Sequence, residues 1–585
     1  MGISNMFNKG KNAIKESMKR FPIEILLSMA TVIILIYMSE AEKWQWDDGL
    51  QRIAMVMALG IPVYLCIQLF LESKNKENEK SRIIYYGTSA ILLIAYGWFL
   101  LKDVNMVEIT RYVGFNLVFI LGFLVIPYID KEENFEIYVI RVLQRFFTTV
   151  VYSVVLYLGL AAILFTINYL LEIKIDPEIY YYTWLIIVGV FAPCFFLGGI
   201  PSKGERLSVK AYPKGLKVLM LYIIMPLISV YTVILYIYFG KIIITMNWPE
   251  GLVSHLVLWY GVISAVTIFL ISAVSDQSQW VKKYINIFPK AILPLMGMMF
   301  VSMGIRINAY GITENRYFVL ALGIWVFGVM IYFSASKKRK NIILPTSLAI
   351  IILVSVFGPL SSYSISKYSQ NRRFEKIANR NNMVENGKVV KSTGQVSKED
   401  QQEISSILHY FNNKHELKDV KYLPDNFKIG DIKSQLGIED SVYYYGDNYE
   451  YFYFTVEESS KPIEIKEYDY LFDLTSYQTD NKKSDVGVTV NYNKASNKFI
   501  IYKDGKEIYS NDFNEYIKAL VDKYGNDNSL NSKSGSIPSE SMRLKDETDK
   551  VKVEFKFKNI SGSKTALNGN IESKELQFYV FIKVK

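Results

Sequence analysis

The chain has 585 residues, of which 51% are hydrophobic and 21% charged, and its mean hydropathy is +0.16. It is too apolar for one soluble domain and too charged to lie wholly in a bilayer, so it should consist of two parts. The formal net charge of +10 belongs entirely to residues 1–360, because residues 361–585 hold 34 basic and 34 acidic side chains. Basic residues confined to short segments between apolar runs set the orientation of membrane spans, so this charge argues against nucleic-acid binding.

The cysteines and histidines offer no site for a disulfide, a metal or a cofactor. Cys66 and Cys194 both lie inside apolar runs, and the chain has three histidines without a Cys/His pair at zinc spacing. Zinc sites need three or four such ligands at defined spacings. The sequence therefore predicts no metal, no cofactor and no catalytic residue.

Apolar runs long enough to cross a bilayer recur through residues 22–360. A spanning helix needs about 20 apolar residues, because the hydrocarbon layer is about 30 Å thick and a helix rises 1.5 Å per residue. We expect about eleven spans, with the ninth short and interrupted by proline. They are placed near 22–39, 50–71, 83–101, 112–129, 146–171, 180–198, 215–240, 252–274, 289–305, 317–335 and 341–360.

The distribution of lysine and arginine predicts the orientation of these spans. If the N-terminus is cytoplasmic, the inner segments hold 24 of the 32 basic residues in the membrane part. This bias is the one that the positive-inside rule describes. A secretory signal peptide is the alternative for the first run, but the run lacks a small-residue cleavage site before Glu40 and ten further spans follow it.

An odd number of spans places the C-terminus outside the cell. The predicted organisation is therefore a basic cytoplasmic N-terminus (1–21), a transmembrane domain (22–360), a polar linker (361–397) and an extracytoplasmic domain (398–585). The location that follows is a bacterial plasma membrane.

The outer domain is predicted to be α+β with strands predominating. A helix over 398–415 would place Ile404, Ile407, Leu408 and Phe411 on one face. Strands are expected over 441–456, 463–474, 486–492 and 499–510, the last with a hairpin turn at 503–505, then a helix over 513–524, a polar loop over 526–541, and strands over 551–558 and 576–584.

Eight aromatic residues fall within twelve positions of the first of these strands, between Tyr443 and Phe454. Outside a membrane, such a strip could stack on sugars or bind a wall polymer or a peptide. The alternative is a strand with one buried and one exposed aromatic face, since aromatic residues favour strands.

Ionisable residues are scarce within the spans, where each costs about 2.5 to 3.5 kcal/mol. Glu24 and His255 lie within a turn of a span end, which indicates interfacial residues rather than a proton relay. Four prolines, Pro62, Pro193, Pro226 and Pro294, fall inside spans, where they could mark packing kinks or the broken helices of a transporter.

The outer loop after the ninth span, residues 306–317, carries two arginines on a side that has few. Arg306, Glu314 and Arg316 could form an ion-paired cap or hold an anionic headgroup. In the alternative, the arginines extend from a plain loop to the interface.

Four stretches together resemble a bacterial family catalogued as domain of unknown function 4153. They are RFP at 20–22, KGLKVLMLYIIMPL at 214–227, the YIYFGKIII block ending with WPEG at 248–251, and YGITENRYFVL at 310–320. The resemblance implies a polytopic inner-membrane protein with an extracytoplasmic C-terminal region, and it supplies no activity. From these motifs and the arginine loop, the candidate ligand or lipid contacts are Arg306, Glu314, Arg316, Tyr310, Trp248 and Lys214.

The function expected from the sequence is a non-enzymatic membrane protein whose spans anchor, and couple to, an outer domain that binds a ligand or senses one. The expected partners are the lipid bilayer and an envelope component or a membrane partner protein. A transporter or flippase for a lipid or small solute is the alternative, and an enzyme acting on a lipid-linked substrate comes third.

Overall fold

A computed structural model describes residues 15–40, 48–76, 78–129, 134–171, 173–202, 205, 212–246, 252–336, 338–392, 394–438, 440, 449–456, 465–475, 481–483, 487–494, 496–524, 536–565 and 571–585. The chain divides into two compact units. Unit 1 comprises residues 1–388 and 414–425, and unit 2 comprises residues 389–413 and 426–585.

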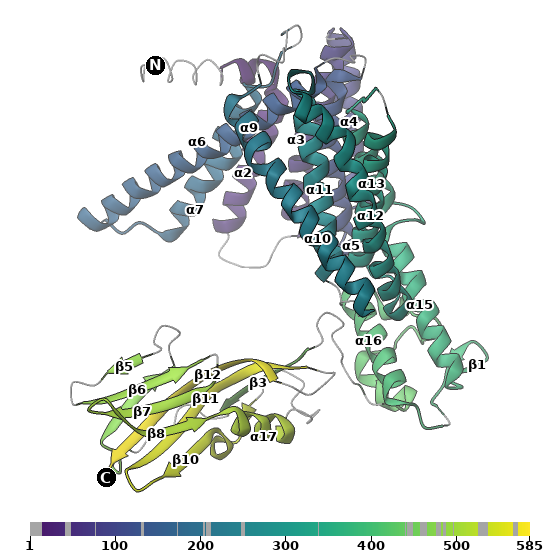
Figure 1. The fold of residues 1–585 in the computed structure, drawn as a ribbon. Helices are drawn as coiled ribbons and strands as arrows, with labels where there is room; N and C mark the ends of the chain where they lie inside the picture. Colours follow the sequence, from purple (N-terminus) through teal and green to yellow (C-terminus); the bar gives the residue numbers. More distant parts are fainter. Residues whose placement is uncertain are drawn as a thin grey trace. The chain divides into compact units, whose positions relative to one another are not determined.

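Unit 1 is helical (Figure 1). Its elements up to residue 360 are α2 (Pro22–Glu40), α3 (Asp48–Ser73), α4 (Glu79–Phe99), α5 (Met106–Val125), η1 (Ile126–Tyr128), α6 (Phe135–Leu170), α7 (Pro177–Ile186), η2 (Ile187–Phe191), α8 (Ala192–Leu197), α9 (Lys214–Val218), η4 (Leu219–Ile224), α10 (Met225–Thr245), α11 (Leu252–Ser272), η5 (Ser275–Gln277), α12 (Gln279–Tyr310), α13 (Glu314–Ala335) and α14 (Ile343–Val356).

Every range predicted as a span coincides with helix, and the helical, multi-pass fold is confirmed. Within the described residues, nine helices are long and apolar enough to cross a membrane. The two predicted spans outside that set are α4, whose first turns carry polar and charged residues, and α14, which has only 14 residues.

Two helices are longer than the apolar runs that predicted them. α6 begins at Phe135 because Glu136, Arg141 and Arg145 are compatible with helix although they interrupt the apolar pattern. The ninth span is the 32-residue helix α12, which contains Pro289 and Pro294 without a break. The expectation of a short, interrupted ninth span was therefore wrong in length, because proline bends a helix more often than it ends one in a packed bundle.

Two spans contain a π-helical segment just before a proline. η2 precedes Pro193, and η4 precedes Pro226. Proline has no backbone N–H and its ring collides with the carbonyl four residues earlier, so the preceding turn widens from α to π geometry. The helix therefore changes from α to π geometry before Pro193 and Pro226. Pro62 lies inside α3, which stays α-helical.

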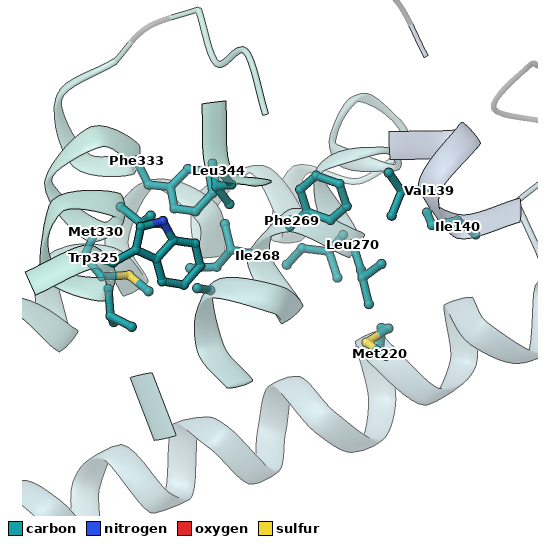
Figure 2. Close-up of a cluster of buried hydrophobic side chains, with 14 of the residues drawn as sticks. Val139, Ile140, Met220, Ile268, Phe269, Leu270, Trp325, Met330, Phe333 and Leu344 are labelled. Atoms are coloured by element: carbon teal, nitrogen blue, oxygen red, sulfur yellow. The ribbon is translucent and has the colours of Figure 1, made fainter. Parts of the chain in front are cut away.

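The core of unit 1 is apolar, and Figure 2 shows the part of it to which α6, η4, α11, α13 and α14 contribute side chains. Ile268, Val326 and Met330 are fully buried, and Trp325 donates its indole N–H to Ser347 Oγ at 3.0 Å. By contrast, α6 and α7 run side by side with most of their apolar side chains exposed, as expected for surfaces that face lipid (Figure 1).

Contacts between connecting segments agree with the alternate crossing of the spans. At the end predicted to be inner, Arg20 binds Glu72, and Asn341 binds Glu136. At the end predicted to be outer, Tyr317 donates to the carbonyl of Leu360. These pairs join segments that the threading places on the same side, although the contacts leave open which side is cytoplasmic.

Residues 361–397, predicted as a linker, contain a 19-residue helix, α15 (Ser362–Arg380), and the short strands β1 (Val384–Glu385) and β2 (Lys388–Val389). α16 (Lys398–Lys414) follows, then the short turns η6 (Leu417–Asp419), η7 (Ile429–Asp431) and η8 (Ile432–Leu436). The predicted apolar face of α16 is confirmed, because its four members are at most 1% exposed.

The rest of unit 2 is strand-rich, as predicted. One sheet has the order β4 (Tyr470–Leu474), β12 (Ile571–Val584), β11 (Val551–Thr565), β3 (Tyr449–Val456), β9 (Ser536–Ile537), with β10 (Arg543–Glu547) also paired to β11. The other has the order β5 (Asn481–Lys483), β6 (Val488–Asn493), β7 (Lys498–Lys503), β8 (Lys506–Asp512). Helix α17 (Asn514–Tyr524) and the turn η10 (Ser539–Met542) complete it.

Aromatic rings join the two sheets. The ring centroids of Phe499 in β7 and Phe555 in β11 are 5.0 Å apart, and those of Phe513 and Phe578 in β12 are 5.5 Å apart. All four rings are fully buried, so they form the centre of the core.

The predicted hairpin is present between β7 and β8. Asp504 and Gly505 both have positive φ, which is the backbone geometry of a tight two-residue turn. In the aromatic strip, Phe452 and Phe454 are buried whereas Tyr453 is 54% exposed, which favours the two-faced strand. The tyrosines at 443–445 lie outside the described residues.

Candidate functional site

The connection between α12 and α13 is a short, tightly covered turn. Gly311 ends α12 with φ 68° and ψ −179°, a conformation that is essentially restricted to glycine. A Cβ at this position would lie 2.7 Å from Arg373 Cδ, so side chains of α15 pack directly on the backbone here.

Side chains from α15 and α13 donate to the carbonyls of this turn. Gln370 Nε2 donates to the carbonyls of Tyr310 and Ile312, both at 3.1 Å. Arg373 Nη1 donates to Tyr310 at 2.8 Å, and Arg316 Nη1 donates to Gly311 at 2.9 Å. Carbonyls left free at the end of a helix would otherwise need water, so α15 replaces water at this end of the bundle.

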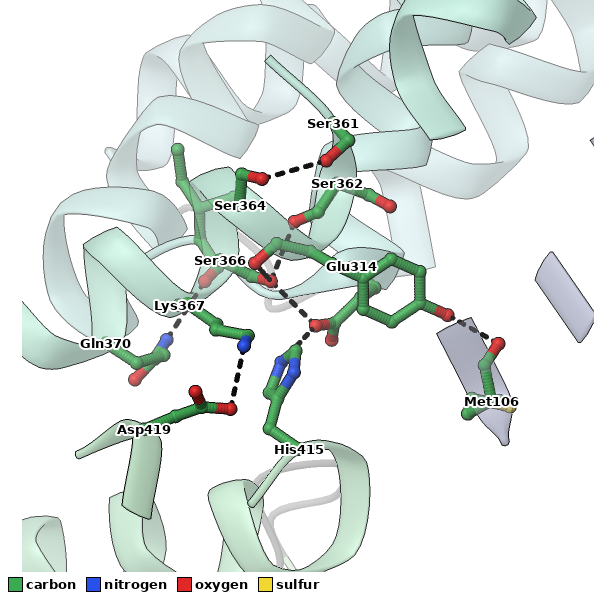
Figure 3. A network of polar contacts seen from close by, with 12 residues as sticks. Met106, Glu314, Ser361, Ser362, Ser364, Ser366, Lys367, Gln370, His415 and Asp419 are labelled. Atoms are coloured by element: carbon green, nitrogen blue, oxygen red, sulfur yellow. Dashed lines mark hydrogen bonds and ion pairs between the residues drawn. The ribbon is translucent and has the colours of Figure 1, made fainter. Parts of the chain in front are cut away.

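Glu314, the first residue of α13, is the centre of a buried polar network (Figure 3). Its Oε1 lies 2.8 Å from His415 Nε2 and accepts a hydrogen bond of 2.6 Å from Ser366 Oγ of α15. The His415 side chain is 1% exposed and that of Glu314 is 12% exposed. Electrostatic contacts in such a site are stronger than in water, because the surrounding dielectric constant is low.

Tyr363 extends the network to α5. Its ring meets the His415 ring edge to face, with the centroids 5.7 Å apart. Its hydroxyl donates to the Met106 carbonyl at 3.0 Å (Figure 3). The same hydroxyl shares a 2.6 Å hydrogen bond with Thr110 Oγ1. One ring thus contacts both α5 and the histidine that binds α13.

His415 belongs to residues 414–425, which we call the return segment because they are part of unit 1 while the chain on both sides is part of unit 2. Asn371 of α15 holds the backbone of this segment at two points: its amide donates to the Asp419 carbonyl at 2.8 Å, and its carbonyl accepts from the Lys421 N–H at 2.7 Å. Lys367 adds a 2.7 Å ion pair with Asp419.

Glu375, one turn further along α15, binds the end of the return segment. Tyr422 Oη donates to Glu375 Oε1 at 2.5 Å, and Lys421 Nζ lies 3.2 Å from Oε2. The hydrogen bond from Tyr422, and then that from Lys421, lowers the pKa of Glu375 below its ordinary value of 4.5. The return segment therefore contacts α15 at intervals from Tyr363 to Glu375.

Sequence reasoning missed α15 and the return segment because the buried face of this helix is largely polar. Ser362, Ser366 and Gln370 recur every four residues and are at most 3% exposed, and Asn371 lies beside them at 8%. A search for apolar periodicity does not register such a stripe. Polar side chains recurring every four residues in a segment without proline or glycine would have been the available signal.

The structure brings together three of the six predicted contact residues. Tyr310, Glu314 and Arg316 all take part in the turn between α12 and α13, and Arg316 also stacks on the Tyr310 ring at 5.6 Å. Arg306 lies one turn earlier in α12, and its buried Nε makes no hydrogen bond within the described residues.

The other two residues are not part of this group. Lys214 is exposed at the start of α9, and Trp248 lies outside the described residues. A ligand or lipid contact at any of the six stays a prediction.

The arrangement is suited to transmitting a change of conformation. Over the described ranges, no group of three His, Cys, Asp or Glu side chains is placed to hold a metal ion. The network instead joins α5, α13, α15 and the return segment through buried hydrogen bonds. The return segment itself contacts α13 and α15, and Tyr363 of α15 connects these contacts to α5.

Comparison with known proteins assigns the chain to a family. The family described as "Domain of unknown function (DUF4153)" matches residues 26–386, more than half of the chain. The chain belongs to the DUF4153 family. The DUF4153 match includes Glu314 and all of α15, and it ends before His415.

A relative of this DUF4153 protein is an uncharacterized protein of Pasteurella multocida (strain Pm70), which is 24% identical over 401 residues. The alignment covers 66% of this chain and 64% of that relative. No solved structure matches the chain.

Proposed function

We propose that this DUF4153 protein is a non-enzymatic, multi-pass protein of a bacterial plasma membrane, in which a strand-rich domain binds a component of the cell envelope and passes its state to the spans. The N-terminus is cytoplasmic and the C-terminal domain is extracytoplasmic in this proposal. The observation that carries it is the return segment, which leaves unit 2 and places His415 against Glu314 at the start of α13.

The course of the chain supports coupling between the units. The polypeptide passes between unit 1 and unit 2 three times, after residues 388, 413 and 425. A domain that is only anchored needs one such passage. The additional two form the return segment, so a change in unit 2 pulls on a segment that is bonded to α15 and α13.

The shortness of the connection also supports coupling. α16 ends at Lys414, and the next residue is His415, whose side chain is buried. Asn371 and Glu375 hold the segment beyond it. Buried polar networks tend to have few arrangements, which favours a switch between discrete states.

The test uses the full chain in lipid nanodiscs and hydrogen–deuterium exchange read by mass spectrometry. Peptidoglycan fragments, anionic wall polymers and anionic lipids are added one at a time. We expect one of them to slow exchange in the sheets of unit 2 and also at the first turn of α13 and in α15. In a Glu314→Gln, His415→Asn double variant, protection of the sheets should persist and protection of α13 should be lost.

Lys418→Gln is the matched control, because Lys418 lies in the same segment but is exposed and pairs only with the exposed Glu416 among described residues. It should behave as wild type. Protection confined to the sheets of the wild-type protein would contradict coupling, and no change with any component would contradict ligand binding.

A transporter or flippase is the second candidate, and the π-helical segments η2 and η4 favour it. Such segments occur frequently at functional sites, because they leave backbone groups without their usual helical partners. Both lie within long apolar spans, the position at which transporters interrupt their helices.

Fluorescent-lipid scrambling and solute uptake in proteoliposomes test this candidate. Pro226→Ala should restore α geometry in η4 and reduce a transport rate severalfold. Pro62→Ala is the control, since Pro62 lies in α3, which has no π segment. Vesicles that move neither lipid nor solute would remove the candidate.

A further inference from the structure

We propose that Glu24 is a proton-binding site, a carboxyl that is held protonated inside unit 1 where α2, α3 and α4 meet. This inference does not depend on coupling through the return segment. It starts from a buried carboxylate that no neighbouring side chain neutralises.

The Glu24 side chain is deeply buried. The residue is 1% exposed, and neither Oε1 nor Oε2 has a hydrogen-bond partner among the described residues. An ionised carboxylate placed in apolar surroundings without a partner costs several kcal/mol, and such groups bind a proton instead.

Arg20, one turn before Glu24 in the chain, is committed elsewhere. Arg20 binds Glu72 in a bidentate pair, with Nε to Oε1 at 2.9 Å and Nη2 to Oε2 at 2.7 Å. It also donates to the carbonyls of Ile200 at 2.9 Å and Pro201 at 3.2 Å. The positive charge of Arg20 therefore neutralises Glu72.

Neutral side chains complete the surroundings of Glu72. Gln68 Nε2 donates to Glu72 Oε1 at 2.9 Å, and Tyr86 Oη of α4 donates to Gln68 Oε1 at 2.8 Å. None of these donors reaches the carboxylate of Glu24.

The charged groups around Glu24 do not favour its anion. The negative charge of Glu72 in α3 disfavours the ionised form of Glu24, and the positive charge of Arg82 in α4 favours it. The effect of Arg82 is weakened because this residue is exposed and screened by solvent. The helices that cover the other side of α2, residues 177–197, contain one charged residue, Glu178. That residue binds Tyr182, which lies beside Ser39 and Glu40 at the opposite end of α2.

A proton fits this site better than a metal ion. Divalent cations take about six to eight oxygen ligands. Here the carboxylate of Glu72 is already occupied by Arg20, and Glu24 has no hydrogen-bond partner among the described residues. A proton neutralises the carboxylate without further ligands.

The position of Glu24 makes exchange with water feasible. It is the third residue of α2 and lies one turn from Arg20, which is 22% exposed. Loss of the proton would leave a buried anion beside the negative Glu72, so the ionised form requires water to enter between α2 and α3. Proton binding is thereby linked to the packing of α2.

The test is labelling of the full chain in nanodiscs with the apolar reagent dicyclohexylcarbodiimide, which modifies protonated carboxyls, followed by peptide mass spectrometry. We expect Glu24 to be labelled, with labelling falling at least tenfold as the pH is raised. Glu24→Gln, which mimics the protonated acid and should fold, abolishes the label. Glu40 is the control on the same helix, because its carboxyl is exposed.

A second measurement guards against poor access of the reagent. The infrared spectrum of the wild type minus that of Glu24→Gln should contain the carbonyl band of a protonated carboxyl. Absence of both the label and the band would overturn the proposal in favour of an ionised carboxylate held by the start of α2. Labelling that sodium or potassium chloride prevents, and choline chloride does not, would overturn it in favour of a metal cation.

Discussion

Single side chains at the end of the bundle where α12 and α13 connect decide how the return segment is held. Glu314 was predicted to lie in a loop and Ser366 in a polar linker, and the structure places each in a helix with its side chain largely buried. The reason is that each meets a polar partner from a distant part of the sequence. His415 is 101 residues from Glu314, so no local pattern contains the pair.

Replacing His415 by asparagine should destabilise unit 1. The substitution removes the contact between His415 and the carboxylate of Glu314, and a buried group deprived of a partner costs about 1–3 kcal/mol. Unfolding midpoints of the full chain in nanodiscs measure the effect. The loss in a Glu314→Gln, His415→Asn double variant should be smaller than the sum of the two single losses, because the residues contact each other. Strict additivity would contradict a direct interaction.

Replacing Tyr422 by phenylalanine should change the response to acid. Because the pKa of Glu375 is lowered in the folded protein, its contribution to stability is present above the ordinary value of 4.5 and is lost as the pH falls through the lower, folded value. The variant should therefore be less stable than wild type at neutral pH and equal to it well below pH 4.5. Unfolding midpoints of both proteins across this pH range test the prediction. A difference in stability that persists in acid would contradict the conclusion that Tyr422 stabilises the ionised form of Glu375.

At the scale of elements, the helix boundaries that were predicted wrongly are those where polar residues interrupt an apolar run. α6 and α12 extend beyond their predicted limits through charged residues, and the first half of α15 buries polar side chains. Propensity and hydrogen bonding continue a helix where hydropathy stops. By contrast, the β7–β8 hairpin with its turn at Asp504 and Gly505 followed local turn chemistry and was predicted correctly, whereas β5 and β10 were not predicted and β4 begins at Tyr470, later than expected.

The turn between α12 and α13 should tolerate no side chain at Gly311. Gly311→Ala combines a backbone conformation that alanine avoids with a Cβ 2.7 Å from Arg373, so a loss of about 1–3 kcal/mol is expected. Gly304→Ala is the matched control, because a Cβ there meets nothing within 4 Å and Gly304 lies inside α12. Unfolding midpoints of both variants in nanodiscs measure the difference, and equal midpoints would show that the turn can rearrange.

At the scale of the whole molecule, the proposed orientation rests on the distribution of basic residues. Substituted cysteines test it, since Cys66 and Cys194 are buried and should react slowly. In intact cells, a membrane-impermeant maleimide should label Lys506→Cys in the β7–β8 turn and should not label Lys283→Cys near the start of α12; both positions are exposed. The opposite result would reverse the orientation and remove the proposal that unit 2 meets the envelope.

The sequence by itself determined the class of protein, a helical multi-pass membrane part followed by a strand-rich part. Transfer of apolar side chains from water and the alternation of strands are local effects, and the sequence records them directly. The tertiary structure alone decided that α15 and the return segment belong to unit 1, and that Glu24 is buried without a hydrogen-bond partner in the part of the chain that the structure describes. Polar contacts between residues far apart in the chain depend on which helices meet, and a single sequence does not record that.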